Sequence, residues 1–240
     1  MRKLCAFALS PGQFPGRRPS RCSPGASASQ AVAHPVLDLV RHGLQLWLRG
    51  QCDALDHLQL DLDGTPKGLL KGRLDTARLQ ARGVVRGELR LSRAIITCRD
   101  LQLDLGRLRP GQPLPLAAPL SVTVDLWCSA ADLQHMVLDA EDAAMGVALL
   151  THFRGPSAGN CRGWQLQITD AGLRLLPPAQ QTQIPPLLLQ LKAVDHEIVV
   201  HGEGVPDRPT TIPLDPAIRI HELRFDAQYL CLRGEALVKP

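Results

Sequence analysis

The chain has 240 residues and a formal net charge of +4; 45% of the residues are hydrophobic but only 3% are aromatic. A single β-rich domain fits this length, with an interior built from Leu, Val, Ile and Ala. No apolar run is long enough for a membrane-spanning helix. The seven cysteines are scattered, odd in number and never spaced as Cys-x-x-Cys, which argues against a disulfide framework and a zinc site. Such cysteine usage is typical of a reducing compartment, so the prediction is a cytoplasmic protein.

Residues 1–33 contain no Asp or Glu and are rich in Pro, Gly, Ser and Arg. This composition predicts a disordered tail, followed by one domain over residues 34–240. The apolar stretch 4–9 is at the lower length limit for a signal peptide and is followed at once by Pro11-Gly12, so export is not supported. A flexible tail, a targeting segment and a wrongly assigned start are the alternatives for this stretch.

The folded part is predicted to open with a helix over residues 35–49. Pro35 suits the first turn, Asp38 and Arg49 complement the helix dipole, and Gly50 is a plausible terminator. The apolar residues at helical spacing are Val36, Leu37, Val40, Leu44, Trp47 and Leu48.

Period-two alternation then predicts strands at 58–62, 77–82, 94–98 and 101–105. A second helix is predicted from Ser129, where Ser129 and Asp132 have capping-box spacing, and it is expected to reach about residue 150. Further strands are expected at 164–168, 187–191, 197–201, 218–225 and 229–237, with turn signals at 170–172, 202–204 and 233–234. This order of elements favours an α+β fold with a mostly antiparallel sheet.

The sharpest catalytic motif is GPSAG at 155–159, which matches the G-x-S-x-G pattern of serine hydrolases. That motif needs a strand before it and a helix after it, and here a loop and a strand follow, so a hydrolase using Ser157 is only a remote alternative. His196 and His201 are five residues apart on a predicted strand and face opposite sides. The prediction is therefore no enzyme, no metal and no cofactor.

Charge is distributed unevenly along the chain. Residues 64–110 carry eleven Lys and Arg against four Asp and Glu, whereas 111–240 carry nine against fourteen. This asymmetry suggests an anionic partner, although the outer face of a sheet can also carry such residues. The basic block contains no Phe, Tyr or Trp for base stacking, so a nucleic-acid partner is not expected.

Several segments resemble the bacterial LmeA-like phospholipid-binding family. They are GLLKGRL at 68–74, ARLQARGV at 77–84, GELRL at 87–91, CRDLQLDL at 98–105 and DLQ at 132–134. The likeness spans roughly residues 35–238 and is most distinctive over 58–140. It implies a tubular lipid-binding (TULIP-like) fold in which a curved, mostly antiparallel sheet wraps one or two helices around an apolar groove.

The resemblance and the Leu-rich, aromatic-poor interior together suggest non-enzymatic binding of a phospholipid or another apolar ligand, peripheral to a membrane. The residues expected to line the groove are Leu37, Val40, Leu44, Leu48, Leu70, Leu79, Ile96, Leu133 and Val137. The residues expected to face an anionic membrane surface are Arg78, Arg82, Arg90 and Arg93. A scaffold or interaction module whose core is filled by the same leucines is the alternative.

Overall fold

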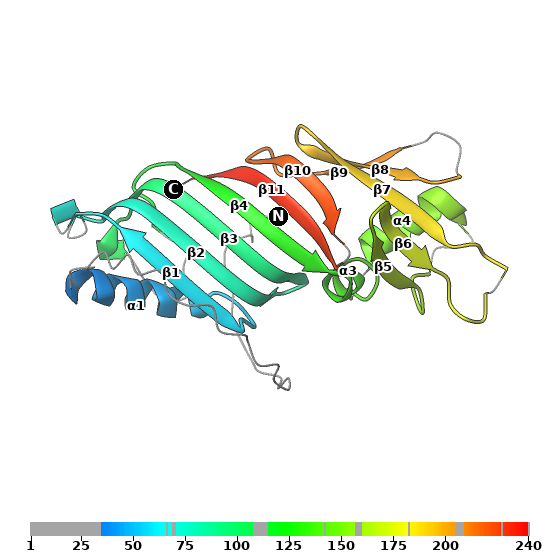
Figure 1. Ribbon diagram of the computed structural model, residues 1–240, viewed down its shortest axis with the longest axis horizontal. Helices are drawn as coiled ribbons and strands as arrows, with labels where there is room; N and C mark the ends of the chain where they lie inside the picture. Colours follow the sequence, from blue (N-terminus) through cyan, green and yellow to red (C-terminus); the bar gives the residue numbers. More distant parts are fainter. Residues whose placement is uncertain are drawn as a thin grey trace, which may run out of the picture.

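The computed structural model describes residues 35–65, 67–68, 71–107, 115–141, 143–156, 160–181, 183–204, 209–226 and 228–239. Within them the fold is α+β, with two antiparallel sheets and three α-helices (Figure 1). The helices are α1 (Pro35–Arg49), α3 (Ala130–Val137) and α4 (Ala144–Arg154). The predicted tail 1–33 lies outside the described residues. No helix in the described part of the chain is long and apolar enough to cross a membrane.

The first sheet is assembled from two distant parts of the chain. Its strand order is β1-β2-β3-β4-β11-β10, and every neighbouring pair is antiparallel. The strands are β1 (His57–Asp63), β2 (Arg73–Arg86), β3 (Leu89–Gln102), β4 (Leu120–Ser129), β10 (Ile218–Asp226) and β11 (Tyr229–Val238), and a 3₁₀ turn, η1 (Leu105–Arg107), follows β3. The chain thus leaves this sheet after β4 and returns to it to place β11 beside β4.

The second sheet is formed by the intervening segment and has the order β5-β6-β7-β8-β9. Its strands are β5 (Gln165–Thr169), β6 (Gly172–Leu176), β7 (Leu187–Val194), β8 (Glu197–Gly202) and β9 (Thr210–Pro213). It lies next to the first sheet, with β10 in contact with β7 and β5 (Figure 1). The sequence predicted a single curved sheet, but two sheets form because the strands of the middle segment pair only with one another.

The two predicted helices have different outcomes. The bounds of α1 match the prediction, and Ser129 and Asp132 form the expected capping box at the start of α3. The single helix expected from Ser129 to about residue 150 is instead two helices, α3 and α4. Ala143, at the start of α4, has a φ of 42°, and a Cβ on Gly146 would lie 2.3 Å from the Val137 carbonyl oxygen. The chain therefore turns between the helices, and α4 packs closely on the end of α3.

The segments 94–98 and 101–105 were predicted as two strands, but residues 89–102 form the single strand β3. Asp100 has a φ of 53° and shifts the side-chain alternation by one position. As a result Cys98 and Leu101, three residues apart, are both buried. The shift in the alternation of apolar residues therefore reflects a local distortion within one strand, and not the end of one strand and the start of another.

The turn expected at 233–234 is wrong, because both residues lie inside β11. A Cβ on Gly234 would be 2.3 Å from the Arg219 carbonyl oxygen of β10. Glycine is needed there for close approach of two strands beside an irregularity in the register between Ile220 and Glu222. The strands β4, β6 and β9 were not predicted, although β4 alternates cleanly from Leu120 to Cys128.

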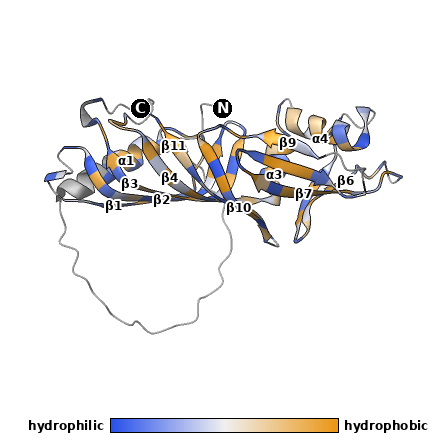
Figure 2. Ribbon diagram, turned by 90° about the horizontal axis from the view of Figure 1, so that it is seen from above, coloured by the Kyte–Doolittle hydropathy of each residue, from blue (hydrophilic) through white to orange (hydrophobic). Residues whose placement is uncertain are grey.

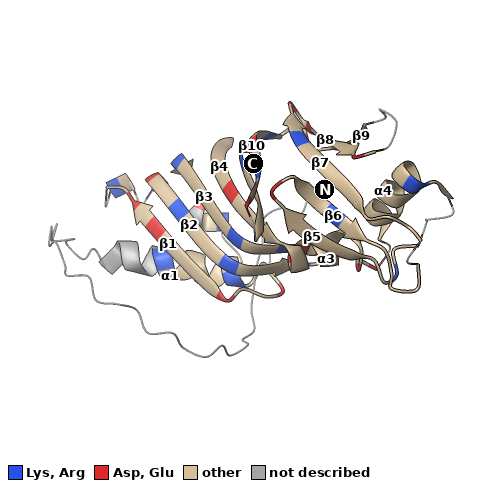
Figure 3. Ribbon diagram, turned by 45° about the vertical axis from the view of Figure 1, so that its right-hand side comes forward, with Lys and Arg blue, Asp and Glu red and all other residues tan. Residues whose placement is uncertain are grey.

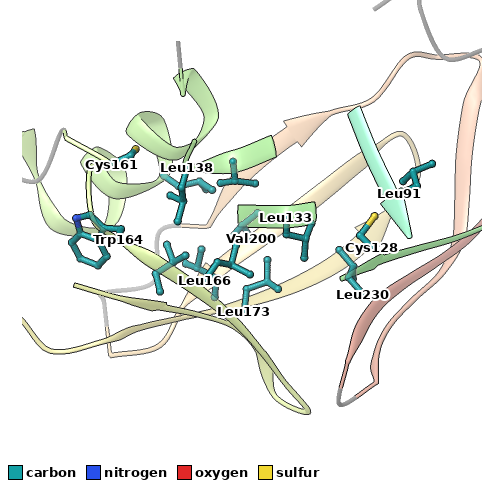
Figure 4. Packing of buried hydrophobic residues seen from close by; sticks show 14 of the residues in the cluster. Leu91, Cys128, Leu133, Leu138, Cys161, Trp164, Leu166, Leu173, Val200 and Leu230 are labelled. Atoms are coloured by element: carbon teal, nitrogen blue, oxygen red, sulfur yellow. The ribbon is translucent and has the colours of Figure 1, made fainter. Parts of the chain in front are cut away.

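Two apolar clusters form the core. The larger one lies at the junction of the sheets, where Leu133 of α3 packs between Cys128 and Leu230 of the first sheet and Val200 of the second (Figure 4). The smaller one lies between α1 and the first sheet and includes Leu44. Helix α1 therefore covers one half of the first sheet, and α3 joins that sheet to the second.

Candidate functional site

The inward face of the first sheet is built from apolar rows that cross all six strands. The pairing register gives three such rows: Leu62, Ala77, Cys98, Val122, Ala236 and Ile218; Leu60, Leu79, Ile96, Val124, Gly234 and Ile220; and Leu58, Ala81, Ala94, Leu126, Leu232 and Leu223. Side chains at alternate positions of paired strands face one side of a sheet, so the rows form a continuous apolar surface.

Burial along these rows falls from β1 toward β10. On β1, Leu58, Leu60 and Leu62 are 5–7% exposed, because α1 packs against this end of the sheet. At the other end Ile218, Ile220, Leu223 and Phe225 are all half-buried, as are Leu126, Leu232, Ala236 and Val238 on β4 and β11. We call the inward side of β4, β11 and β10 the open apolar face.

The open apolar face continues onto the second sheet. Leu223 and Phe225 of β10 pack against the larger core cluster together with Leu191, Ile198 and Ile212 of β7, β8 and β9. These residues are also only half-buried. Figure 2 shows apolar residues on β11, β10 and β7, the strands on either side of the junction. A surface of aliphatic side chains therefore spans both sheets.

The predicted groove residues fall into two groups. Leu44 is in the smaller cluster, with Ile96 packed against it, and both Leu48 and Leu79 contact the two clusters. Leu133 and Val137 of α3 are buried at the junction. The side chains of Leu37, Val40 and Leu70 lie outside the described residues.

The residues of the open apolar face on β10 and β11 were missed as site residues. Their signal was present, because Ile218 and Ile220 alternate with polar residues. Alternation indicates which residues share a face, but it does not show whether a helix covers that face. Only the position of α1 makes these residues different from those of β1.

The opposite, outward face of the first sheet carries a basic row with an aromatic residue at its centre. The register aligns His57, Arg82, Arg93, Trp127, Cys231 and Arg224. The Arg93 guanidinium carbon lies 4.8 Å from the centroid of the Trp127 ring, which is a cation–π geometry. Figure 3 shows Lys and Arg on β2 and β3.

The predicted membrane-facing arginines differ in exposure. Arg78 and Arg82 are exposed, as expected from their alternation with apolar residues, whereas Arg90 and Arg93 are half-buried. Within the described part of the chain none of the four forms an ion pair, in contrast to Arg233, which donates to Asp125 at 2.6 Å. Their positive charge is therefore not offset by a bonded carboxylate.

The described residues offer little for catalysis. Burial raises the pKa of the thiols of Cys98, Cys128, Cys161 and Cys231, that of Cys128 to about 12, so these groups stay protonated at neutral pH. No group of three His, Cys, Asp or Glu side chains with metal-binding geometry occurs among them.

The GPSAG motif stands in the reverse of the order that a serine hydrolase needs. Helix α4 ends at Arg154 just before it, and β5 begins after it at Gln165. Ser157 itself lies outside the described residues.

A scan against protein-family models matches residues 36–235 to the LmeA-like phospholipid-binding family. The chain belongs to this family. The match covers most of the chain, including all the strands of both sheets except the last residues of β11. No curated protein and no solved structure matches the chain. Membership of the family indicates lipid binding, with a phospholipid as the ligand.

Proposed function

We propose that this protein binds a phospholipid without catalysing a reaction, and that the acyl chains lie along the open apolar face. The observation that carries the proposal is that Leu126 on β4, Leu232, Ala236 and Val238 on β11 and all the inward residues of β10 are only half-buried, whereas the inward leucines of β1 under α1 are buried. Burying one CH₂ group contributes about 0.8 kcal/mol, so an acyl chain on this face gains several kcal/mol. A tubular lipid-binding arrangement follows, with the chains running from the first sheet toward the second.

The chemistry of this face suits acyl chains. Its side chains are aliphatic, with Phe225 as the aromatic exception on β10. Flexible aliphatic side chains pack against flexible hydrocarbon without imposing a fixed ligand shape. In the covered half, by contrast, the α1 residues Leu44 and Trp47 are only 5% and 6% exposed, and the inward leucines there form a filled core.

We also propose that the protein is peripheral to a membrane in a reducing compartment, with its basic outward face toward anionic headgroups. The support is the row containing Arg82, Arg93 and Trp127, since Trp is favoured at the membrane interface and cations without a bonded carboxylate attract anionic lipids. In this proposal the acyl chains contact the inward face of the first sheet and the membrane surface contacts its outward face.

Native mass spectrometry of the purified full chain tests the lipid proposal. The expected result is a bound species heavier by the mass of a phospholipid, and Leu223→Asn should lower its occupancy. The matched control is Leu237→Asn on the adjacent strand, because Leu237 is 44% exposed and alternates with the inward Ala236 and Val238. A chain that carries no lipid, and takes none up from vesicles, would favour the scaffold alternative.

Flotation with vesicles tests the membrane proposal. Replacing Arg82 and Arg93 with Gln should weaken binding to anionic vesicles at low salt by about 2 kcal/mol, roughly thirtyfold, and leave neutral vesicles unaffected. Replacing Arg162 and Arg174 with Gln removes the same charge from exposed positions in and beside the second sheet and should have little effect. Equal losses in both double variants would mean that net charge, and not the basic row, attracts the membrane.

A further inference from the structure

The first sheet has an opening between β3 and β4. These strands pair regularly from Arg93 opposite Trp127 to Cys98 opposite Val122. Pairing resumes only beyond β3, where Leu103 bridges Leu116 and the Ala117 amide donates to the Gln102 carbonyl oxygen at 2.9 Å. Between these points residues 99–101 and 118–121 have no ladder partners across the gap.

A surface pocket of about 600 Å³, open to solvent, lies at this opening. Its size is within the range of small-molecule sites. At the opening the backbone of Asp100 is left-handed, with a φ of 53°, and β3 diverges from β4 while Arg99 and Leu101 on either side stay paired with β2. Missing ladder bonds also leave backbone N–H and C=O groups of both strands able to bond a ligand.

The rim of the pocket is polar. Thr97 and Thr123 lie directly opposite each other, one pair before the regular pairing of β3 and β4 ends. Arg99, Asp100 and Ser121 complete the polar lining. Arg99 is exposed, and in the described part of the structure no carboxylate forms an ion pair with it. Hydroxyls and a guanidinium donate hydrogen bonds to phosphate oxygens, and the Asp100 carboxylate can accept one from a headgroup hydroxyl or ammonium.

The floor of the pocket is apolar and leads to the open apolar face. Cys98 and Leu120 line the pocket and are buried members of the cluster under the sheet. Leu120 pairs with Val238 of β11, which is half-buried, and the next inward residues are Val122 and Ala236. The polar rim and the open apolar face are therefore linked by apolar side chains, of which Cys98, Leu120 and Val122 are buried.

We propose that this opening binds the phosphate-bearing headgroup of the lipid, with Arg99 contacting the phosphate and the acyl chains passing over Leu120 onto the open apolar face. This assignment rests on the proposed phospholipid binding and adds the position of the headgroup. It requires a phosphodiester whose alcohol carries a hydrogen-bond donor for Asp100.

Calorimetric titration of the full chain with monomeric dihexanoylphosphatidylglycerol tests the assignment. Arg99→Gln should weaken binding about ten- to a hundredfold, the ratio expected for the loss of one charge-assisted hydrogen bond. Binding of dihexanoylglycerol, which lacks the phosphate, should be unchanged in this variant. The control is Arg174→Gln, which removes an exposed charge from β6 in the second sheet and should leave both affinities unchanged. A joint Thr97→Val and Thr123→Val variant should also weaken only the phosphate-bearing ligand.

The alternative outcomes are distinguishable. If Arg99→Gln and the parent bind dihexanoylphosphatidylglycerol equally, the headgroup assignment is overturned while lipid binding stands. If inorganic phosphate alone binds as tightly as the lipid, the opening serves a soluble phosphate compound, and the lipid assignment of this site is overturned. If the parent binds neither dihexanoyl compound, the proposed function itself fails, and the headgroup site fails with it.

Discussion

The two edge strands of the first sheet, β1 and β10, have the same inward apolar pattern but opposite exposure. The inward leucines of β1 are buried beneath α1, while the inward residues of β10 are half-buried and have the second sheet as their neighbour. Each strand has three inward aliphatic side chains, and β10 adds Phe225, so composition does not account for the difference. An apolar face becomes core where a helix covers it, and it becomes a candidate ligand surface where it is left open.

The largest expected effect comes from truncating matched leucines on the two edges. Leu60→Ala on β1 should lower the free energy of unfolding by about 2–5 kcal/mol, because it leaves a cavity in a closed core. Leu223→Ala on β10 should cost about half as much, since its side chain is already partly in water. Urea denaturation of both variants measures the difference. Equal losses would mean that the face on β10 is covered in solution and would contradict the contrast.

A smaller loss of stability is expected from a substitution at Gly234, where β10 and β11 lie close together. Gly234→Ala would place a Cβ 2.3 Å from the Arg219 carbonyl oxygen and force β10 away from β11, at a cost of about 1–3 kcal/mol. Gly204→Ala is a useful comparison, since its backbone φ of 70°, unlike that of Gly234, is unfavourable for alanine, but its Cβ would meet no atom within 4 Å. Thermal unfolding should rank Gly234→Ala as the more damaging. The reverse order would mean that the strands are not this close.

The next largest loss of stability is expected at the junction of the two sheets, where a capping box begins α3. Ser129 accepts a hydrogen bond from the Asp132 amide at 3.2 Å, and Asp132 in turn accepts from the Ser129 amide at 2.8 Å and from the Ser92 hydroxyl of β3. Ser129→Ala should therefore cost about 1 kcal/mol of stability. Ser121→Ala, at an exposed position on the same strand, should be close to neutral in the same urea titration. If the two substitutions cost the same, the capping box does not stabilise α3 as described.

The smallest expected effect is a gain in stability from a substitution in α1, the helix that covers the β1 end of the first sheet. Gly43 lies in α1, is exposed, and a Cβ there would meet no atom within 4 Å. Gly43→Ala should raise the free energy of unfolding by about 0.5–1 kcal/mol, because alanine loses less backbone entropy than glycine in a helix. Denaturation by urea checks the sign. A loss of stability would show that α1 is not helical at this position in solution.

Most of the strands and the first helix were predictable because each is specified by local periodicity. The bounds of α1 follow from Pro35, the apolar spacing and Gly50, and the cap of α3 follows from Ser129 and Asp132. The errors have tertiary causes. The shift of alternation at Asp100 and the close approach at Gly234 are responses to neighbouring strands, and neither has an unambiguous local signature.

The candidate site was predictable only in its chemistry. An aliphatic interior and an arginine-bearing outer face are visible in the alternation of Ala77, Leu79 and Ala81 with Arg78 and Arg82. Of the residues predicted to line the groove, Leu44 on α1 and Leu133 on α3 are buried in the apolar clusters, and their contact with a ligand stays a prediction. Half-burial depends on what packs above a residue, so the open apolar face on β10 and β11 had to come from the structure.

The sequence by itself determined the family, the strand-rich α+β character, the first helix and the apolar side of each predicted strand. Side-chain alternation and helix capping are short-range properties, and a single segment is enough to express them. Only the tertiary structure decided that β11 returns to pair with β4, that α1 stops short of covering β10, and that β3 and β4 separate at a surface pocket. The pairing of β11 with β4 arises from contacts between residues more than a hundred positions apart, such as Val122 and Ala236, and no local pattern encodes such a pairing.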